Sequence, residues 1–315
     1  MTRTIGWLLL VLAATGEGSV AGAQQRIEAR WPFDAGGSVR IMNPFGRIRV
    51  IGWDADSLAV SGRLGKGAQA GRFYAAGDAR VRKLGVDVPL GQSDSEVSRA
   101  DLEVHLPRRA SVWVKSATAD IMVEGVDGTL DLNSVSGAIR VVGTPQDVSA
   151  ETMDGVVEIA GGTGRARVKT VSGGILLRGA SEDLGASTLS GTIVVRAAGW
   201  QRGGTGVQRG KFESVTGDIR FEGEVGRGGV VELESQSGAV DVRVPATTVA
   251  DFDLVTIGGT ITNRLTATAP VRRAAGVGQE LHLSTGAGGG GGGGGGGAQV
   301  TVRSFKGAIL LEAKP

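Results

Sequence analysis

The chain has 315 residues, of which 41% are apolar, 21% charged and 4% aromatic. This length and apolar share suit one or two globular units, and the scarcity of aromatic residues argues against a base-stacking surface and against a nucleic-acid partner. Because the chain has no cysteine, disulfides, a thiol nucleophile and a lipoprotein anchor are excluded. A formal net charge of +2 creates no strong electrostatic field.

Residues 1–23 have the composition of a secretory signal peptide. Arg3 supplies the positive charge, the segment from Ile5 to Ala14 is apolar, and Ala21-Gly22-Ala23 is a small-residue cleavage site. The apolar run is shorter than the roughly 20 residues of a membrane-spanning helix. We therefore expect an exported protein that is periplasmic, on the cell surface or secreted, with no transmembrane segment in the mature chain.

Residues 36–111 predict a first repeat unit followed by an irregular β cap. Apolar side chains alternate with other residues from Ser38 to Gly52, as in a pair of strands. From Leu58 to Leu106 the apolar runs continue, but glycine-rich and polar turns interrupt any fixed period. We expect these strands to cover one end of a stack, because an open end would expose apolar side chains and unpaired strand edges.

Residues 112–263 carry an internal repeat with a period of 18 residues. Its anchor positions are Ala119, Gly137, Gly155, Gly173 and Gly191, and an aliphatic side chain follows two and four residues after each anchor. This period-2 alternation indicates strands. The anchor glycines indicate corners where the backbone makes a close approach or adopts a positive φ.

One repeat unit of 18 residues holds two short strands and is too small to bury a core alone. Stacking successive units at about 4.8 Å per layer would place like side chains on one another. The sequence therefore predicts an all-β, parallel β-helix-like solenoid of roughly 18-residue coils with an N-terminal β cap, in which residues 24–315 form a single domain.

A serine or threonine stands three residues before every anchor from Ala119 onward. These hydroxyls share strand parity with apolar positions, so we expect them to point inward and to satisfy backbone groups at the corners. An outward polar array matched to a ligand is the alternative, and the strand parity argues against it.

After Gly191 the repeat continues with insertions. Anchors follow at Gly217, Gly238, Gly259 and Gly307, and a long insertion occupies residues 264–298. This insertion contains a run of ten glycines, 288–297, which favours a flexible coil. Residues 299–315 form the last predicted unit, and the role of the glycine run stays open.

The insertion between residues 197 and 209 holds the candidate ligand-binding residues. Trp200, Arg202 and Arg209 stand on a glycine-flanked segment, where an aromatic ring and two guanidinium groups would stack on a sugar or pair with an anionic polymer. The alternative is that Trp200 packs against an exposed layer of the stack.

No motif for catalysis, metal binding or cofactor binding is found in the sequence. His105 and His282 are the only histidines, and with no cysteine they leave a zinc site without a ligand set. There is no Gly-x-Ser-x-Gly nucleophile motif and no phosphate-binding loop followed by lysine and a helix. We therefore predict no catalytic residue, no metal and no cofactor.

Several segments resemble one family of exported bacterial proteins, the "putative adhesin" repeat domain, a domain of unknown function. They are SVRIMNPFGRIRVIGWD near the start, the recurring SVSGAIRVVG, TVSGGILLRG and SVTGDIRFEG, and the closing VTVRSFKGAILLE. The resemblance covers roughly residues 36–313. It implies a parallel β-helix-like solenoid, an exported location and no established enzymatic chemistry.

The sequence thus predicts an exported, non-enzymatic β-solenoid that serves as a scaffold or an adhesin-like binding module. Its partner is unidentified, with a cell-wall or surface glycan or another envelope protein as candidates. Two alternatives stay open. One is a polysaccharide lyase or glycoside hydrolase on the same fold, and the other is a domain that contacts an envelope-signalling partner.

Overall fold

The computed structural model describes residues 24–66, 71–89, 91, 93–95, 98–179, 181–197, 206–273, 277–286 and 297–314. The expected signal peptide, Trp200, Arg202 and all but the last residue of the glycine run lie outside these ranges. Every regular element in the described ranges is a β-strand. The described residues contain no helix with the length and hydropathy needed to span a membrane.

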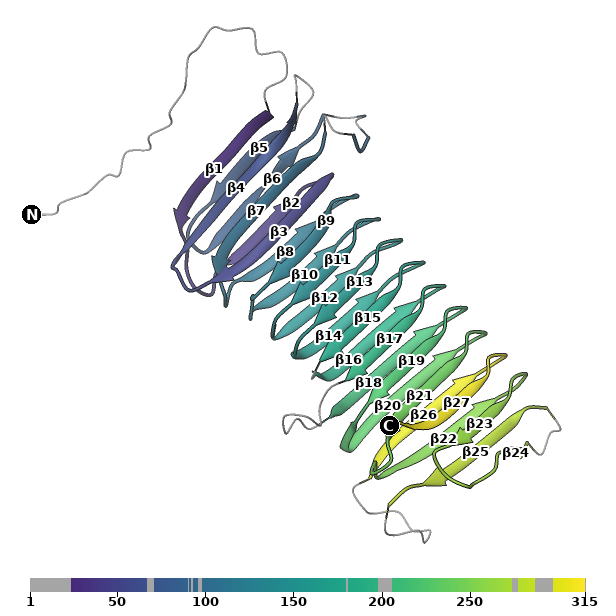
Figure 1. The fold of residues 1–315 in the computed structure, drawn as a ribbon. Helices are drawn as coiled ribbons and strands as arrows, with labels where there is room; N and C mark the ends of the chain where they lie inside the picture. The colour runs from purple at the N-terminus through teal and green to yellow at the C-terminus, as the bar shows by residue number, and fades with distance from the viewer. Residues whose placement is uncertain are drawn as a thin grey trace, which may run out of the picture.

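The strands form two large, mostly parallel sheets, here called sheet A and sheet B (Figure 1). Sheet A has 13 strands, in the spatial order β1 (Gln24–Pro32), β4 (Ser57–Lys66), β7 (Ala100–Pro107), β3 (Gly46–Trp53), β9 (Asp120–Glu124), β11 (Ile139–Val142), β13 (Val157–Ala160), β15 (Ile175–Gly179), β17 (Ile193–Ala197), β19 (Ile219–Gly223), β21 (Val240–Pro245), β27 (Ile309–Lys314) and β23 (Ile261–Arg264). Sheet B has 14, in the order β24 (Val271–Arg272), β25 (Gln279–Ser284), β22 (Ala250–Thr256), β26 (Ala298–Ser304), β20 (Val225–Ser235), β18 (Val207–Ser214), β16 (Ser181–Thr188), β14 (Thr163–Lys169), β12 (Asp147–Glu151), β10 (Thr129–Asn133), β8 (Ser111–Lys115), β2 (Ser38–Met42), β6 (Val81–Asp87) and β5 (Arg72–Gly77).

From β8 to β23 the chain alternates between the sheets, so that one strand of sheet B and the next strand of sheet A make one layer, here called a rung. Each strand pairs in parallel with the equivalent strands of the rungs before and after it, so that paired residues are one repeat apart in the sequence. Ile139 lies opposite Ile121 on one side and Val157 on the other, and Leu132 lies opposite Val114 and Ala150. Leu132 and Ile139, which are close in sequence, therefore belong to different sheets and not to a hairpin.

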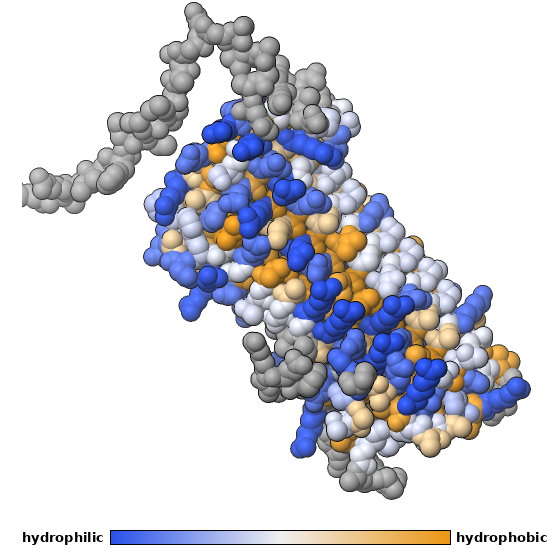
Figure 2. All heavy atoms as spheres, viewed as in Figure 1, coloured by the Kyte–Doolittle hydropathy of each residue, from blue (hydrophilic) through white to orange (hydrophobic). Residues whose placement is uncertain are grey.

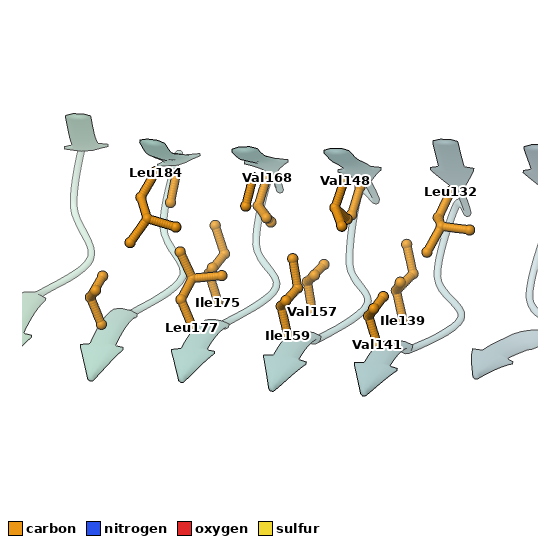
Figure 3. Packing of buried hydrophobic residues seen from close by; sticks show 14 of the residues in the cluster. Leu132, Ile139, Val141, Val148, Val157, Ile159, Val168, Ile175, Leu177 and Leu184 are labelled. Atoms are coloured by element: carbon orange, nitrogen blue, oxygen red, sulfur yellow. The ribbon is translucent and has the colours of Figure 1, made fainter. Parts of the chain in front are cut away.

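The core lies between the two sheets and runs the length of the stack. Inward side chains of successive rungs lie one above another, as Figure 3 shows for Val141, Ile159 and Leu177 of sheet A. All three are at most 3% exposed. Since one rung alone buries little apolar surface, the stability of this core comes from contacts between neighbouring rungs.

The corners that lead from sheet B to sheet A confirm the inward position of the hydroxyl row. Ser134 and Thr152 are buried, and their side-chain oxygens accept hydrogen bonds from the backbone N–H groups of Gly137 (2.9 Å) and Gly155 (3.1 Å). A Cβ on Gly155 would collide with the carbonyl oxygen of Gly137. The anchor glycines are therefore required by a close backbone approach, whereas positive φ occurs at the opposite corners, as at Gly161 (127°).

The N-terminal end of the stack does not follow chain order. β2 and β3 pair with β8 and β9, whereas β6 and β7 pair on the outer side of β2 and β3. β1, β4 and β5 are added by antiparallel pairing at this end. The irregular segment 58–106 therefore supplies one more parallel rung as well as antiparallel end strands.

The C-terminal end departs from chain order more strongly. The final segment of the chain is inserted between two earlier rungs: β26 pairs with β20 and β22, and β27 pairs with β21 and β23. The last unit in sequence is thus not the last rung of the stack. Within the long insertion, β24 and β25 pair antiparallel beyond β22 and cover the end of sheet B.

Candidate functional site

The outward side chains of sheet B form a row that is mostly polar, with one gap. In register across the rungs stand Asp131, Ser149, Arg167, Gly185, Lys211 and Glu232. Around Gly185, over which the side chain of Arg167 lies, is a hollow of about 440 Å³, here called the Gly185 groove. This volume lies within the range of about 300–1,000 Å³ that small-molecule sites occupy.

An ion-pair ladder runs along one side of the groove. The side chains of Asp147, Arg165, Asp183 and Arg209 occupy matching positions on β12, β14, β16 and β18 and alternate in charge. Arg165 lies 3.4 Å from Asp147, and the Asp183 carboxylate lies 3.9 Å from Arg165 and 3.2 Å from Arg209. Opposite charges on directly opposed strand positions stabilise sheet pairing.

Asp183 is the most enclosed charged group of the groove, with its side chain only 10% exposed. Besides its ion pair with Arg209, the Asp183 carboxylate forms an ion pair with Arg167, whose Nη2 lies 2.7 Å from Oδ1. Burial alone would raise the pKa of Asp183, but the hydrogen bonds from Arg167 and Arg209 outweigh it and hold the pKa below its ordinary value. The carboxylate is therefore ionised at neutral pH.

The rim of the groove carries cationic side chains, and some of their hydrogen-bond donors have no partner among the described residues. Lys211 lies 2.8 Å from Glu213, which raises the pKa of Lys211 and keeps it charged. The side chain of Arg209 is 71% exposed, and its Nε donates to Asp183. Its two terminal nitrogens make no hydrogen bond to any described residue, so they are free to bind a ligand.

One of the three predicted ligand-binding residues lies in this groove. Arg209 lines it from β18, whereas Trp200 and Arg202 lie outside the described residues. Sequence reasoning missed Gly185, Asp183, Arg167 and Lys211. The signal for them was a glycine at an outward strand position with cationic residues one repeat away on either side.

The two histidines lie in separate places. His105 is on β7 with Nε2 2.8 Å from the Glu103 carboxylate, and His282 is on β25 with Nδ1 3.0 Å from the Asp253 carboxylate. These two strands belong to different sheets at opposite ends of the stack. The histidines are therefore not brought together, and the Gly185 groove contains neither of them.

No family model and no curated protein matches the chain. A structure described as a putative adhesin from Bacteroides fragilis is 10% identical, with a TM-score of 0.46 and coverage of 92% of this chain and 98% of that one. A putative adhesin from Parabacteroides distasonis is 10% identical, with a TM-score of 0.44 and coverage of 91% and 97%.

A putative cell adhesion protein from Clostridium sporogenes is 9% identical, with a TM-score of 0.28 and coverage of 92% and 100%. At such identities and scores, none of these structures indicates what the present chain binds.

Proposed function

We propose that this chain is an exported, non-enzymatic β-solenoid that acts as an adhesin-like binding module of the cell envelope. In this proposal the stacked rungs are a rigid scaffold, and the Gly185 groove is the binding site. The ligand class is an anionic glycan, meaning a saccharide chain that carries carboxylate or sulfate groups.

The composition and shape of the Gly185 groove carry this proposal. Four cationic side chains, Arg167, Lys169, Arg209 and Lys211, line it together with the acids Asp183, Glu213 and Glu232, which leaves one net positive charge (4 − 3). The planar guanidinium of Arg209 matches the geometry of a carboxylate or sulfate. The acids provide acceptors for sugar hydroxyl groups.

A carbohydrate-active enzyme is the second candidate, because the same groove holds three carboxylates. Glycoside hydrolysis needs one carboxyl group that is protonated near neutral pH. The lowered pKa of Asp183 suits ion pairing better than proton donation, which favours binding over hydrolysis.

The test is binding of the purified chain to polygalacturonate and to hyaluronate, with neutral dextran as the reference, by biolayer interferometry. We expect binding to an anionic polymer that weakens as salt concentration rises. Arg209→Ala removes a charge-assisted hydrogen bond, which contributes about 1.5–3 kcal/mol, so binding should weaken about tenfold or more.

The matched control is Arg140→Ala, which removes an arginine of similar exposure from β11 of the other sheet. It should leave the affinity unchanged. Absence of binding to both polyanions, or equal loss in the two variants, would contradict the proposal. Release of reducing ends that stops in Glu232→Gln would instead support the enzyme.

A further inference from the structure

An apolar ridge runs along the corner that joins sheet B to sheet A. At each of these corners the residue after the buried hydroxyl points outward, and its backbone N–H bonds to the corner before it, as from Met153 to Val135 (2.9 Å) and from Val171 to Met153 (3.0 Å). In stack order the ridge consists of Ala117, Val135, Met153, Val171, Leu189, Val215, Gln236, Phe305 and Ile257.

The ridge is exposed and almost free of charge. Val135, Met153, Leu189 and Phe305 are between 47% and 53% exposed. The corners that carry them are the evenly spaced turns along the upper right edge of the stack in Figure 1. In Figure 2 the upper right edge of the stack is mostly pale, whereas the strongly hydrophilic residues gather on the face toward the viewer. A continuous apolar stripe on a surface marks an interaction site.

Part of the ridge borders a hollow. Beside its C-terminal half lies a hollow of about 780 Å³, lined by Leu189, Val215, Gln236, Phe305 and Ile257. This hollow offers space to receive side chains of a partner.

We propose that this ridge is the interface of a homodimer, in which a second copy of the chain packs antiparallel about a twofold axis. A second copy has the same spacing between rungs, so its side chains stay in register over the length of the ridge. The twofold axis passes between the Leu189 and Val215 rungs. Met153 of each copy then faces Phe305 of the other, a favourable sulfur–aromatic pair.

Charge complementarity favours this register. Next to the ridge, on the sheet B side, a row of residues includes Glu151, Lys169, Glu234 and Arg303. In the proposed register Glu151 faces Arg303 of the second copy, and Lys169 faces Glu234 of the second copy. The twofold axis creates each pair twice. Within one chain Lys169 lies 3.4 Å from the Glu151 carboxylate, and Glu234 lies opposite Arg303 on the neighbouring strand, so the proposed contacts extend these pairs across the interface.

Shifting the second copy by one rung weakens this complementarity. A shift one way places Glu151 opposite Glu234, although Lys169 then faces Glu213. A shift the other way places Lys169 opposite Arg303 and Glu213 opposite its own copy. Like charges that face each other at an interface disfavour it. The proposed register also places Met153 and Val171 of one copy against the hollow of the other.

Sedimentation velocity of the full chain at 1 to 100 μM tests the interface. We expect a dimer that becomes a monomer in the double variant Met153→Asp, Leu189→Asp. The control is Val142→Asp, which places the same charge on an exposed apolar residue of sheet A, away from the ridge. A monomer at every concentration, or a dimer that survives the double variant, would overturn the proposal.

The absence of native cysteine allows a direct test of the register. A mixture of Met153→Cys chains and Phe305→Cys chains should form disulfide-linked pairs under mild oxidation. Met153→Cys chains alone should not, because two copies of this position lie five rungs apart, about 24 Å, and a disulfide needs Cα atoms within about 7 Å. Efficient self-linkage of Met153→Cys would exclude this register. Neither experiment contains a glycan. A negative result would therefore contradict the dimer without bearing on glycan binding in the Gly185 groove.

Discussion

Asp183 shows how one residue links the scaffold to the groove. Its carboxylate is nearly buried on the outer face of sheet B, where it contacts arginines from the rungs on both sides. Taken singly, exposed ion pairs contribute little to stability. Here the enclosed carboxylate joins Arg167 and Arg209, so it orders two of the cations that line the groove.

This arrangement predicts a stability difference that depends on pH. The folded-state pKa of Asp183 is lowered, so its contribution is present above the unfolded value of about 3.9 and is lost as the pH falls through the folded value. Urea unfolding should show a lower midpoint for Asp183→Asn than for the wild type at pH 7. The two midpoints should converge below pH 4.

The control for this experiment is Asp56→Asn, because Asp56 is exposed and makes no ion pair with the described residues. Its midpoint should follow that of the wild type at both pH values. A gap between wild type and Asp183→Asn that is as large at pH 3 as at pH 7 would show that the ion pairs are not its cause.

At the scale of the element, the corner turn is the feature most strictly defined by the sequence. The hydroxyl three residues before each anchor and the glycine at the anchor act together. At most corners the hydroxyl accepts the N–H of the anchor, as Thr188 does from Gly191 at 3.0 Å. Thr170 instead donates to the carbonyl oxygen of Gly173, and the hydroxyls of Ser214 and Ser235 have no hydrogen-bond partner among the described residues. The absent side chain of glycine lets the next corner stack closely. Both features were readable from the 18-residue period.

Adjacent glycines of one corner provide a test of this account. A Cβ at Gly173 would collide with the carbonyl oxygen of Gly155, whereas a Cβ at Gly174 would meet its nearest neighbour, the carbonyl oxygen of Thr192, at 3.7 Å. Gly173→Ala should therefore destabilise the chain by about 1–3 kcal/mol. Gly174→Ala should be neutral or slightly stabilising.

Urea unfolding of both variants, followed by circular dichroism, measures the difference. If the two substitutions had equal effects on the midpoint, close stacking of the anchor glycines would not be what the corner requires.

Some features were not predictable, and the reasons are physical. The inward residues Val300 and Val302 of β26 lie opposite Val231 and Leu233 of β20 on one side and opposite Phe252 and Leu254 of β22 on the other, and all of these residues are apolar. Alternation of apolar residues therefore specifies strands and faces but not the order of rungs.

The candidate site was only partly predictable for a related reason. The inward positions repeat because the core requires it, whereas each outward position is free to vary. Arg209 is identified from the insertion in which it stands. Gly185 belongs to the site only because sheet pairing places Arg167 and Lys211 on the strands beside it, and this pairing is not visible at a single position of the sequence. Likewise, the ridge position next to the hydroxyl row was not singled out, although it is apolar in most units.

At the scale of the whole molecule, the structure is a stack of rungs with antiparallel strands at both ends and the final segment of the chain inserted near one end (Figure 1). The stack gives the proposed groove a rigid frame and gives the proposed ridge its regular spacing. If the ridge pairs as proposed, both Gly185 grooves of the dimer open on the same side, which favours a polymeric ligand through bivalent binding.

The central claim is the order and parallel register of the rungs, and distances between paired spin labels test it directly. Asp131, Glu232, Thr301 and Asp253 occupy the same outward row of sheet B, and Glu232, Thr301 and Asp253 lie five, six and seven rungs from Asp131. At about 4.8 Å per rung, the separations from Asp131 should be roughly 24, 29 and 34 Å.

The measurement is double electron–electron resonance on chains that carry two labelled cysteines each, diluted with unlabelled protein. The account predicts that Thr301 lies closer to Asp131 than Asp253 does, although Thr301 comes later in the chain. A shorter distance to Asp253 than to Thr301, or distances that do not rise by one rung at each step, would contradict it.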